Sequence, residues 1–175
     1  VQKEESDFLS AMRMHGQTAD AWSKESGKTK GYSIIHAGYK YNMTDVEAAI
    51  GIKQLEKIDS FLFKRERLAK FYLDELRNLP IQLPIHHQKN KERVWYLFSI
   101  LVKNRDKVIE KLKAKGIGTG IHYKAVHLEP FYGGKLGQFP NAEYVSQRTL
   151  SLPMTPRVTQ EQVQYAVDSL KEILK

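Results

Sequence analysis

The 175-residue sequence contains no cysteine, and that absence excludes several kinds of protein at once. A chain without cysteine has no disulfide framework, no thiolate zinc site and no thiol nucleophile. The sequence also lacks an apolar run of membrane-spanning length, since the longest run covers only residues 94–102. It has no internal repeat and no low-complexity segment. Together with a mean hydropathy of −0.51, these absences predict a globular protein that needs no membrane and works in the cytoplasm.

The formal net charge of +8 invites comparison with nucleic-acid-binding proteins. Basic and acidic residues are, however, intermixed along the two most charged stretches, residues 53–77 and 103–115. Mixed signs at helical spacing are typical of solvated helix faces. No zinc-finger spacing or ribonucleoprotein motif is present. The sequence therefore predicts no nucleic-acid partner, and retention on DNA that falls steeply with salt would contradict this prediction.

Two helices are predicted in the first half of the chain. Apolar residues at helical spacing indicate a short helix over residues 4–15, ended by Gly16. A long helix is expected to start at Thr44, where Thr44 and Glu47 have the spacing of a capping box. We expect this helix to kink near residues 59–60 and to end before the first of two prolines, Pro80.

The second half of the chain alternates strands with helices. Residues 94–102 are apolar on both faces and predict a buried central strand, and residues 117–123 are a second strand candidate. Helices are expected over residues 105–115, capped by Asn104, over residues 141–150, and after a Thr159–Gln162 capping box. This order predicts a small α/β layer in which helices cover one face of a sheet.

The segment from Gly38 to Gly51 carries the most functional information. Lys40 and Asn42 lie directly before a predicted helix N-terminus, where free N–H groups and the helix dipole favour an anion. A lysine charge and an amide donor at that place are suited to a phosphate group. The alternative is a solvated lysine and a turn asparagine before an ordinary helix cap. Spacing alone favours that alternative.

A glycine-rich stretch followed by two histidines is the second candidate. The G-x-G-x-G spacing that begins at Gly116 does not match a dinucleotide-binding motif, and no helix is predicted after it. His122 and His127 stand at positions i and i+5, too far apart for one helical face, and no carboxylate pair accompanies them. We therefore predict no metal site. Each histidine is equally well explained as a hydrogen-bonded structural residue.

Several motifs occur in an order that resembles one family. Residues 38–45 read Gly-Tyr-Lys-Tyr-Asn-Met-Thr-Asp and are followed by Ala48-Ala49. This pattern is similar to the signature of the DegT/StrS sugar aminotransferases, which use pyridoxal phosphate, and most like their 4-amino-4-deoxyarabinose-type branch. The resemblance continues in register through further motifs: His15-Gly16-Gln17, Ala21-Trp22, and residues 54–59, 65–67, 95–98, 116–123 and 150–154.

The resemblance implies a fold and a set of site residues. It implies the small C-terminal α/β domain of the aspartate-aminotransferase (type I pyridoxal phosphate) fold over residues 59–175. Residues 1–58 would be the tail of the large cofactor-binding domain and the start of a long connecting helix. In a homodimer, Asn42 and Lys40 would contact the phosphate of the partner subunit's pyridoxal phosphate. The family more often has Asn where this chain has Lys40 and Arg where it has Asn42. His127, and secondarily His122, would face the substrate.

The resemblance also implies a reaction. The family transfers an amino group from glutamate to a keto nucleotide-sugar in polysaccharide or glycan biosynthesis. Its Schiff-base lysine stands N-terminal to the matched region, and no lysine in this chain has that context. We therefore expect a C-terminal portion of such an enzyme, inactive by itself. The alternative is a stand-alone non-catalytic module that regulates or binds a partner, which a start codon at Val1 would favour.

Overall fold

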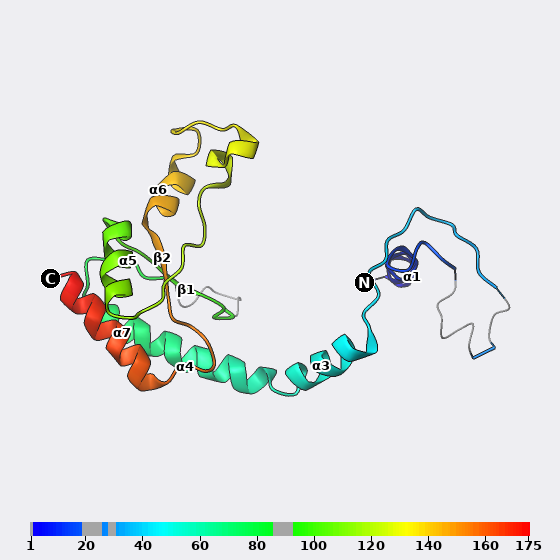
Figure 1. The fold of residues 1–175 in the computed structure, drawn as a ribbon, viewed down its shortest axis with the longest axis horizontal. Helices are drawn as coiled ribbons and strands as arrows, with labels where there is room; N and C mark the ends of the chain where they lie inside the picture. The colour runs from blue at the N-terminus through cyan, green and yellow to red at the C-terminus, as the bar shows by residue number, and fades with distance from the viewer. Residues whose placement is uncertain (1, 19–25, 28–30, 86–92) are drawn as a thin grey trace. The chain divides into compact units, whose positions relative to one another are not determined.

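A computed structural model describes residues 2–18, 26–27, 31–85 and 93–175 (Figure 1). The chain divides into two compact units, residues 1–56 and residues 57–175. Ala21-Trp22, one of the motifs that carry the resemblance, lies outside the described residues. Within the described ranges, no helix is both long enough and apolar enough to cross a membrane.

In its described residues, the first unit has the helices α1 (Lys3–Met12) and α3 (Asp45–Leu55). α1 confirms the predicted helix but ends before residue 15, because Met14 forms a β-bridge with Lys40 and His15 adopts a positive φ. The predicted capping box of α3 is confirmed. The Thr44 hydroxyl accepts a hydrogen bond from the Glu47 N–H at 3.3 Å, and the Glu47 carboxylate accepts one from the Thr44 N–H at 2.8 Å.

The prediction of one long helix with a kink at residues 59–60 is wrong. α3 ends at Leu55, and a separate helix, α4 (Ile58–Leu76), begins after Glu56 and Lys57. Neither glycine nor proline stands at this break, and nothing in the local sequence explains it.

The second unit is built on two antiparallel strands, β1 (Phe98–Leu101) and β2 (Thr149–Leu152), in which Ser99 lies opposite Ser151. Single bridges extend this sheet on both sides, from Gln82 to Leu101 and from Gly120 to Ser151. Besides α4, the described part of this unit contains α5 (Arg105–Ala114), η1 (Val126–Leu128), η2 (Pro130–Tyr132), α6 (Pro140–Arg148) and α7 (Gln160–Ile173), of which η1 and η2 are short 3-10 turns.

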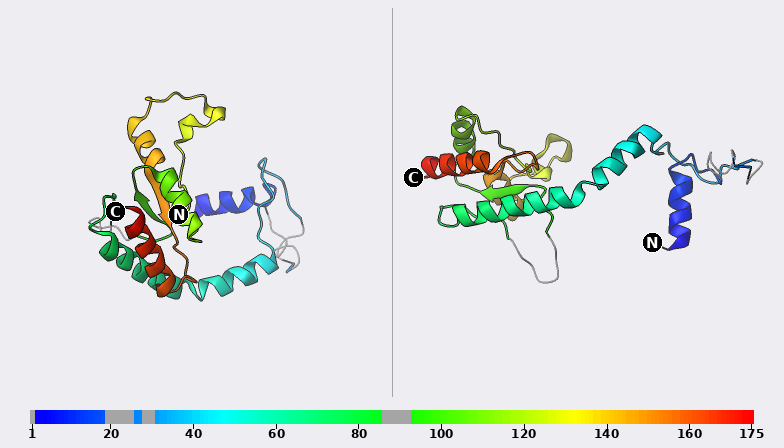
Figure 2. Two further views of the ribbon diagram at one scale, coloured as in Figure 1. Left: turned by 60° about the vertical axis from the view of Figure 1, so that its left-hand side comes forward. Right: turned by 90° about the horizontal axis from the view of Figure 1, so that it is seen from below.

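The core lies on one face of the sheet, as predicted. Phe98 and Ile100 of β1 pack with buried side chains of α4, α5 and α7, and α7 packs against α4 (Figure 2). Tyr72 of α4 stacks on Phe98 with ring centroids 4.7 Å apart. Because strand residues alternate between faces, Ser99 points away from this core. The sheet therefore has an apolar face and a second face that carries hydroxyl groups.

Both strands are shorter in the structure than the sequence predicts. Residues 94–97 lie before β1, and the Arg65 guanidinium donates to the carbonyl oxygens of Trp95 and Tyr96 at 2.9 and 2.8 Å. Residues 117–123 pair with β2 only at Gly120, since glycine at alternate positions weakens a strand. The helix predicted after Asn104 is confirmed as α5, but Asn104 adopts a left-handed conformation there and makes no side-chain cap.

Candidate functional site

The segment that carries Lys40 and Asn42 is anchored by its backbone. The Tyr39 N–H donates to the Met12 carbonyl at 2.7 Å, the Tyr39 carbonyl accepts from the His15 N–H at 2.8 Å, and the Tyr41 N–H donates to Arg13 at 2.8 Å. The close packing of this segment against residues 12–16 requires glycine at residue 38, because a Cβ atom there would stand 2.1 Å from the Gly16 nitrogen. These contacts thus fix the backbone from which the side chains of Lys40 and Asn42 extend.

Lys40 and Asn42 are placed where an anion can reach them. The Lys40 side chain is exposed, and its ammonium lies 3.7 Å from the Met14 sulfur. Asn42 is half-buried, and its amide makes no hydrogen bond to any residue that the structure describes. α3 begins directly after Thr44, so peptide N–H groups and the positive end of the helix dipole lie near both side chains. An ammonium, an amide and peptide N–H groups are donors that suit a phosphate group.

His122 is held by a chain of hydrogen bonds on the hydroxyl-bearing face of the sheet. Its Nδ1 lies 2.9 Å from the Ser151 Oγ, which in turn lies 2.8 Å from the Ser99 Oγ. The His122 carbonyl accepts from the Thr149 hydroxyl at 3.4 Å. The imidazole ring lies against Gly120, where a Cβ atom would stand 2.5 Å from the ring Cε1. Nε2 makes no hydrogen bond within the described part of the chain.

His127 is held by a buried carboxylate. Its Nε2 lies 3.0 Å from an oxygen of Glu143, and the two side chains are only 12% and 8% exposed. Its ring packs edge-on against Phe139 with centroids 4.9 Å apart. The Gly134 N–H donates to the His127 carbonyl at 2.9 Å. These contacts match the structural-histidine alternative, but Nδ1 remains available to a second partner.

Glu143 organises the loop that precedes α6. Its carboxylate accepts hydrogen bonds from the Gly137 N–H at 2.9 and 2.8 Å and from the Phe139 N–H at 3.1 Å. These N–H groups, with that of Gly137 the strongest, and the neighbouring His127 hold the pKa of Glu143 below its ordinary value, against the opposing effect of burial. The loop thus held in place presents the exposed aromatic ring of Phe131.

Sequence reasoning missed Glu143 and the two serines. Glu143 stands in the first turn of α6, where an acidic residue is expected for the helix dipole alone. Ser99 and Ser151 give a weak signal, because only the strand register places them opposite each other. Lys40 and Asn42 belong to the first unit, and both histidines belong to the second. No hydrogen bond or ring contact joins His122 to His127 in the described residues.

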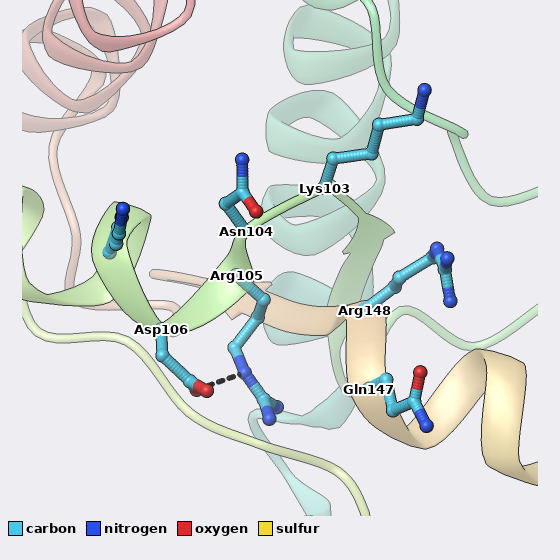
Figure 3. A pocket seen from close by; sticks show the side chains of 7 residues that line it. Lys103, Asn104, Arg105, Asp106, Gln147 and Arg148 are labelled. Carbon is cyan, nitrogen blue, oxygen red and sulfur yellow. Dashed lines mark hydrogen bonds and ion pairs between the residues drawn. The ribbon is translucent and has the colours of Figure 1, made fainter.

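A basic cavity of about 530 Å³ lies between the start of α5 and the end of α6 (Figure 3). It contains none of the four predicted site residues. Its most buried cation, Arg105, is already engaged by Asp106 and by the carbonyl oxygens of Ser146 and Thr149. This arginine joins α5 to α6 and β2. Among the described residues, no group of three or more potential ligand residues is placed to hold a metal ion.

Comparison with known proteins covers almost the whole chain. Residues 2–171 match the model of the DegT/DnrJ/EryC1/StrS aminotransferase family. Among curated relatives, the uncharacterized protein MJ1066 of Methanocaldococcus jannaschii is 40% identical over 183 aligned positions, which cover 98% of this chain and 47% of that protein. The chain therefore spans about half the length of this curated relative.

Solved structures show the same relationship. S. venezuelae DesV, solved in complex with a ketimine intermediate, is 29% identical with a TM-score of 0.88, and the match covers 99% of this chain and 45% of DesV. The putative sugar aminotransferase Spr1654 of Streptococcus pneumoniae is 27% identical with a TM-score of 0.88, covering 99% of this chain and 46% of Spr1654. The matched region is the C-terminal part of these enzymes. The predicted α/β fold and the resemblance are therefore confirmed.

Proposed function

Because the chain belongs to the DegT/DnrJ/EryC1/StrS aminotransferase family, we propose that it is the C-terminal portion of a pyridoxal-phosphate-dependent sugar aminotransferase. The proposed reaction transfers an amino group from glutamate to a keto nucleotide-sugar in polysaccharide or glycan biosynthesis. The family match over residues 2–171 carries the proposal. The proposal that the substrate is a sugar is supported by the similarity to Spr1654, a putative sugar aminotransferase.

Lys40 and Asn42 would hold the cofactor phosphate of a partner subunit in a homodimer. Both lie just before α3, and neither side chain is taken up by a charged partner within the described residues. Lys40 contributes a positive charge, whereas Asn42 contributes a directed amide N–H. Bound pyridoxal phosphate supplies the electron sink that transamination needs. These two residues would retain the bound cofactor and fix the position of its phosphate.

His122 and His127 would border the substrate. His122 is the better placed of the two, because its Nε2 bonds to none of the described residues while Ser151 holds Nδ1. His127 commits its Nε2 to Glu143, which leaves Nδ1 for a substrate atom. We propose that each histidine donates to or accepts from a polar group of the sugar and that neither forms a covalent bond to it.

A test of the reaction compares this chain with the protein encoded by its whole reading frame. Coding sequence upstream of Val1 should supply a Schiff-base lysine, and the full protein should aminate a keto nucleotide-sugar with glutamate as donor. The 175-residue chain should not do so. Turnover by the chain alone would contradict the expected inactivity. Absence of turnover by the full protein, despite bound pyridoxal phosphate and a panel of keto nucleotide-sugars, would contradict the reaction.

A test of the phosphate site uses cofactor affinity in the full protein. Asn42→Ala removes a hydrogen bond to a charged group, which is worth about 1.5–3 kcal/mol, so cofactor affinity should fall about ten- to a hundredfold. Lys40→Ala should also weaken binding, and more so at low salt. Lys57→Ala, which removes an exposed lysine outside the segment, is the matched control. Equal affinity in Asn42→Ala and this control would remove Asn42 from the site.

A further inference from the structure

We infer that Ser99 and Ser151 are positioning residues that fix neutral His122 with its proton on Nε2, so that this nitrogen donates to an oxygen of the substrate. The inference rests on the proposed function for the identity of the substrate. The hydrogen-bond geometry itself belongs to this chain and needs neither cofactor nor substrate.

The first step concerns which hydroxyl donates. Ser151 Oγ stands between two partners, Ser99 Oγ at 2.8 Å and His122 Nδ1 at 2.9 Å. A serine hydroxyl has one hydrogen to donate. Its oxygen can accept two bonds, but among the described residues the Ser151 hydroxyl bonds only to these two partners. Ser151 therefore donates to one of them and accepts from the other, which leaves two possible directions for the chain of bonds.

The second step decides between the two directions. If Nδ1 carried the proton and donated to Ser151, the Ser151 hydroxyl would donate to Ser99. The Ser99 hydrogen would then need a further acceptor, and none exists among the described residues. In the opposite direction Ser99 donates to Ser151 and Ser151 donates to Nδ1, so every hydroxyl hydrogen in the chain has an acceptor. Because Ser99 is half-buried, the arrangement in which its hydrogen has an acceptor in the protein is favoured.

The third step concerns the position of the ring. Ser99 and Ser151 are cross-strand partners, and backbone bonds of 3.1 and 2.8 Å join Ser151 to Gly120. Sheet pairing thus holds both the Ser151 hydroxyl and Gly120 next to the His122 ring. Gly120 leaves space for the ring, which a Cβ atom would occupy. These contacts therefore fix the position of the His122 ring as well as the nitrogen that carries its proton.

The consequence is that His122 presents an N–H group. With Nδ1 accepting from Ser151, the proton of a neutral imidazole must be on Nε2. An N–H donor recognises oxygen acceptors, which sugar hydroxyl and phosphate oxygens both provide. His122 would therefore recognise substrate as a neutral donor.

Nitrogen NMR of the histidine side chains in the 175-residue chain tests the inference. In the neutral state of its ring, His122 should show the Nε2–H tautomer. Ser151→Ala should move the Nδ1 resonance of His122 towards that of an imidazole without a hydrogen-bonded Nδ1. Ser99→Ala should move it less, because Ser151 still donates to Nδ1 but loses its bond from Ser99. Ser169→Ala is the matched control, because Ser169 is also buried but lies on α7, and this substitution should not move the resonance.

Two results would overturn the inference: an Nδ1–H tautomer in the unsubstituted chain, or a Nδ1 resonance in Ser151→Ala that equals that of the control. If Ser151→Ala does not fold, the tautomer of the unsubstituted chain still decides the question. The outcome is independent of the proposed function, because no cofactor or substrate is present. A tautomer as expected, combined with no turnover by the full protein, would reject the reaction and keep the positioning role.

Discussion

Replacing Tyr72 by Phe should destabilise the second unit in a way that its burial explains. The Tyr72 side chain is fully buried in α4, and its hydroxyl donates to the Pro153 carbonyl at 3.0 Å, directly after β2. The substitution keeps the stacked ring and removes only the hydroxyl, which leaves a partly buried carbonyl without its donor. Such a loss costs about 1–2 kcal/mol. With a typical urea dependence, the unfolding midpoint should fall by about 0.5–1 M.

Tyr165→Phe is the matched control for this prediction. Its hydroxyl also donates to a backbone carbonyl, that of Lys115 at 3.2 Å, but Tyr165 is 52% exposed. Water replaces the lost partner at such a site, so the expected change is within about 0.5 kcal/mol. Urea titrations followed by the fluorescence of buried Trp95 measure both variants. Equal midpoints for the two variants would refute the reasoning that burial sets the cost.

Alkaline pH offers an independent check on the same side chain. Burial raises the pKa of Tyr72 above its ordinary value of 10.0. Above that value the unfolded chain releases the phenolic proton first, so the contribution of Tyr72 to stability is present below pH 10 and is lost as pH rises through the folded pKa. The unsubstituted chain should therefore lose stability between about pH 10 and 11 more steeply than Tyr72→Phe. Parallel curves would contradict the assigned burial effect.

The remaining predictions concern the anchored loop, the glycine contact and the core. The pKa of Glu143 is lowered in the folded chain, so its carboxylate stabilises the fold above pH 4.5, its ordinary pKa, and this contribution is lost as pH falls through the folded pKa. The melting temperature of Glu143→Gln should therefore vary less with acid pH than that of Glu110→Gln, an exposed-site control. Gly38→Ala should speed amide exchange at Tyr39, whereas Gly51→Ala, with nothing within 4 Å of its Cβ position, should not. Leu170→Ala, fully buried in α7, should cost about 2–5 kcal/mol of unfolding free energy in a urea titration.

Features that depend on local chemistry were predictable from the sequence. The capping boxes at Thr44 and Thr159 both form, because a hydroxyl and a carboxylate or amide three residues later need only each other. The centre of β1 and the buried stripe of α7 follow from apolar periodicity. The motif at residues 38–45 also identified the family, which spacing alone would have left undecided.

Features that depend on distant residues were not predictable. The predicted strand over residues 94–102 begins only at Phe98, and Arg65, far earlier in the sequence, donates to two carbonyl oxygens just before it. The burial of Glu143 likewise depends on a loop that folds back to donate two N–H groups. Neither arrangement leaves a periodic signal, because each joins one side chain to the backbone of a separate segment.

The two pairs of candidate residues, one in each unit, are positioned by different means, and this difference decides which substitutions are informative. Backbone bonds and the contact between Gly16 and Gly38 hold the segment of Lys40 and Asn42. Replacing either side chain by alanine therefore leaves the anchor in place, so a loss of cofactor affinity reports on phosphate binding. The histidines are held by their own ring nitrogens, and alanine would also release Ser151 or Glu143.

Informative histidine variants must therefore keep the nitrogen that serves as the anchor. An asparagine amide lies near the position of Nδ1 and a glutamine amide near that of Nε2. His122→Asn would keep a partner for Ser151 while removing Nε2 from the substrate side. His127→Gln would keep a partner for Glu143 while removing Nδ1. In the full protein, an increase in the KM for the proposed keto nucleotide-sugar in these two variants, with an unchanged urea midpoint, would separate recognition of the substrate from support of the fold.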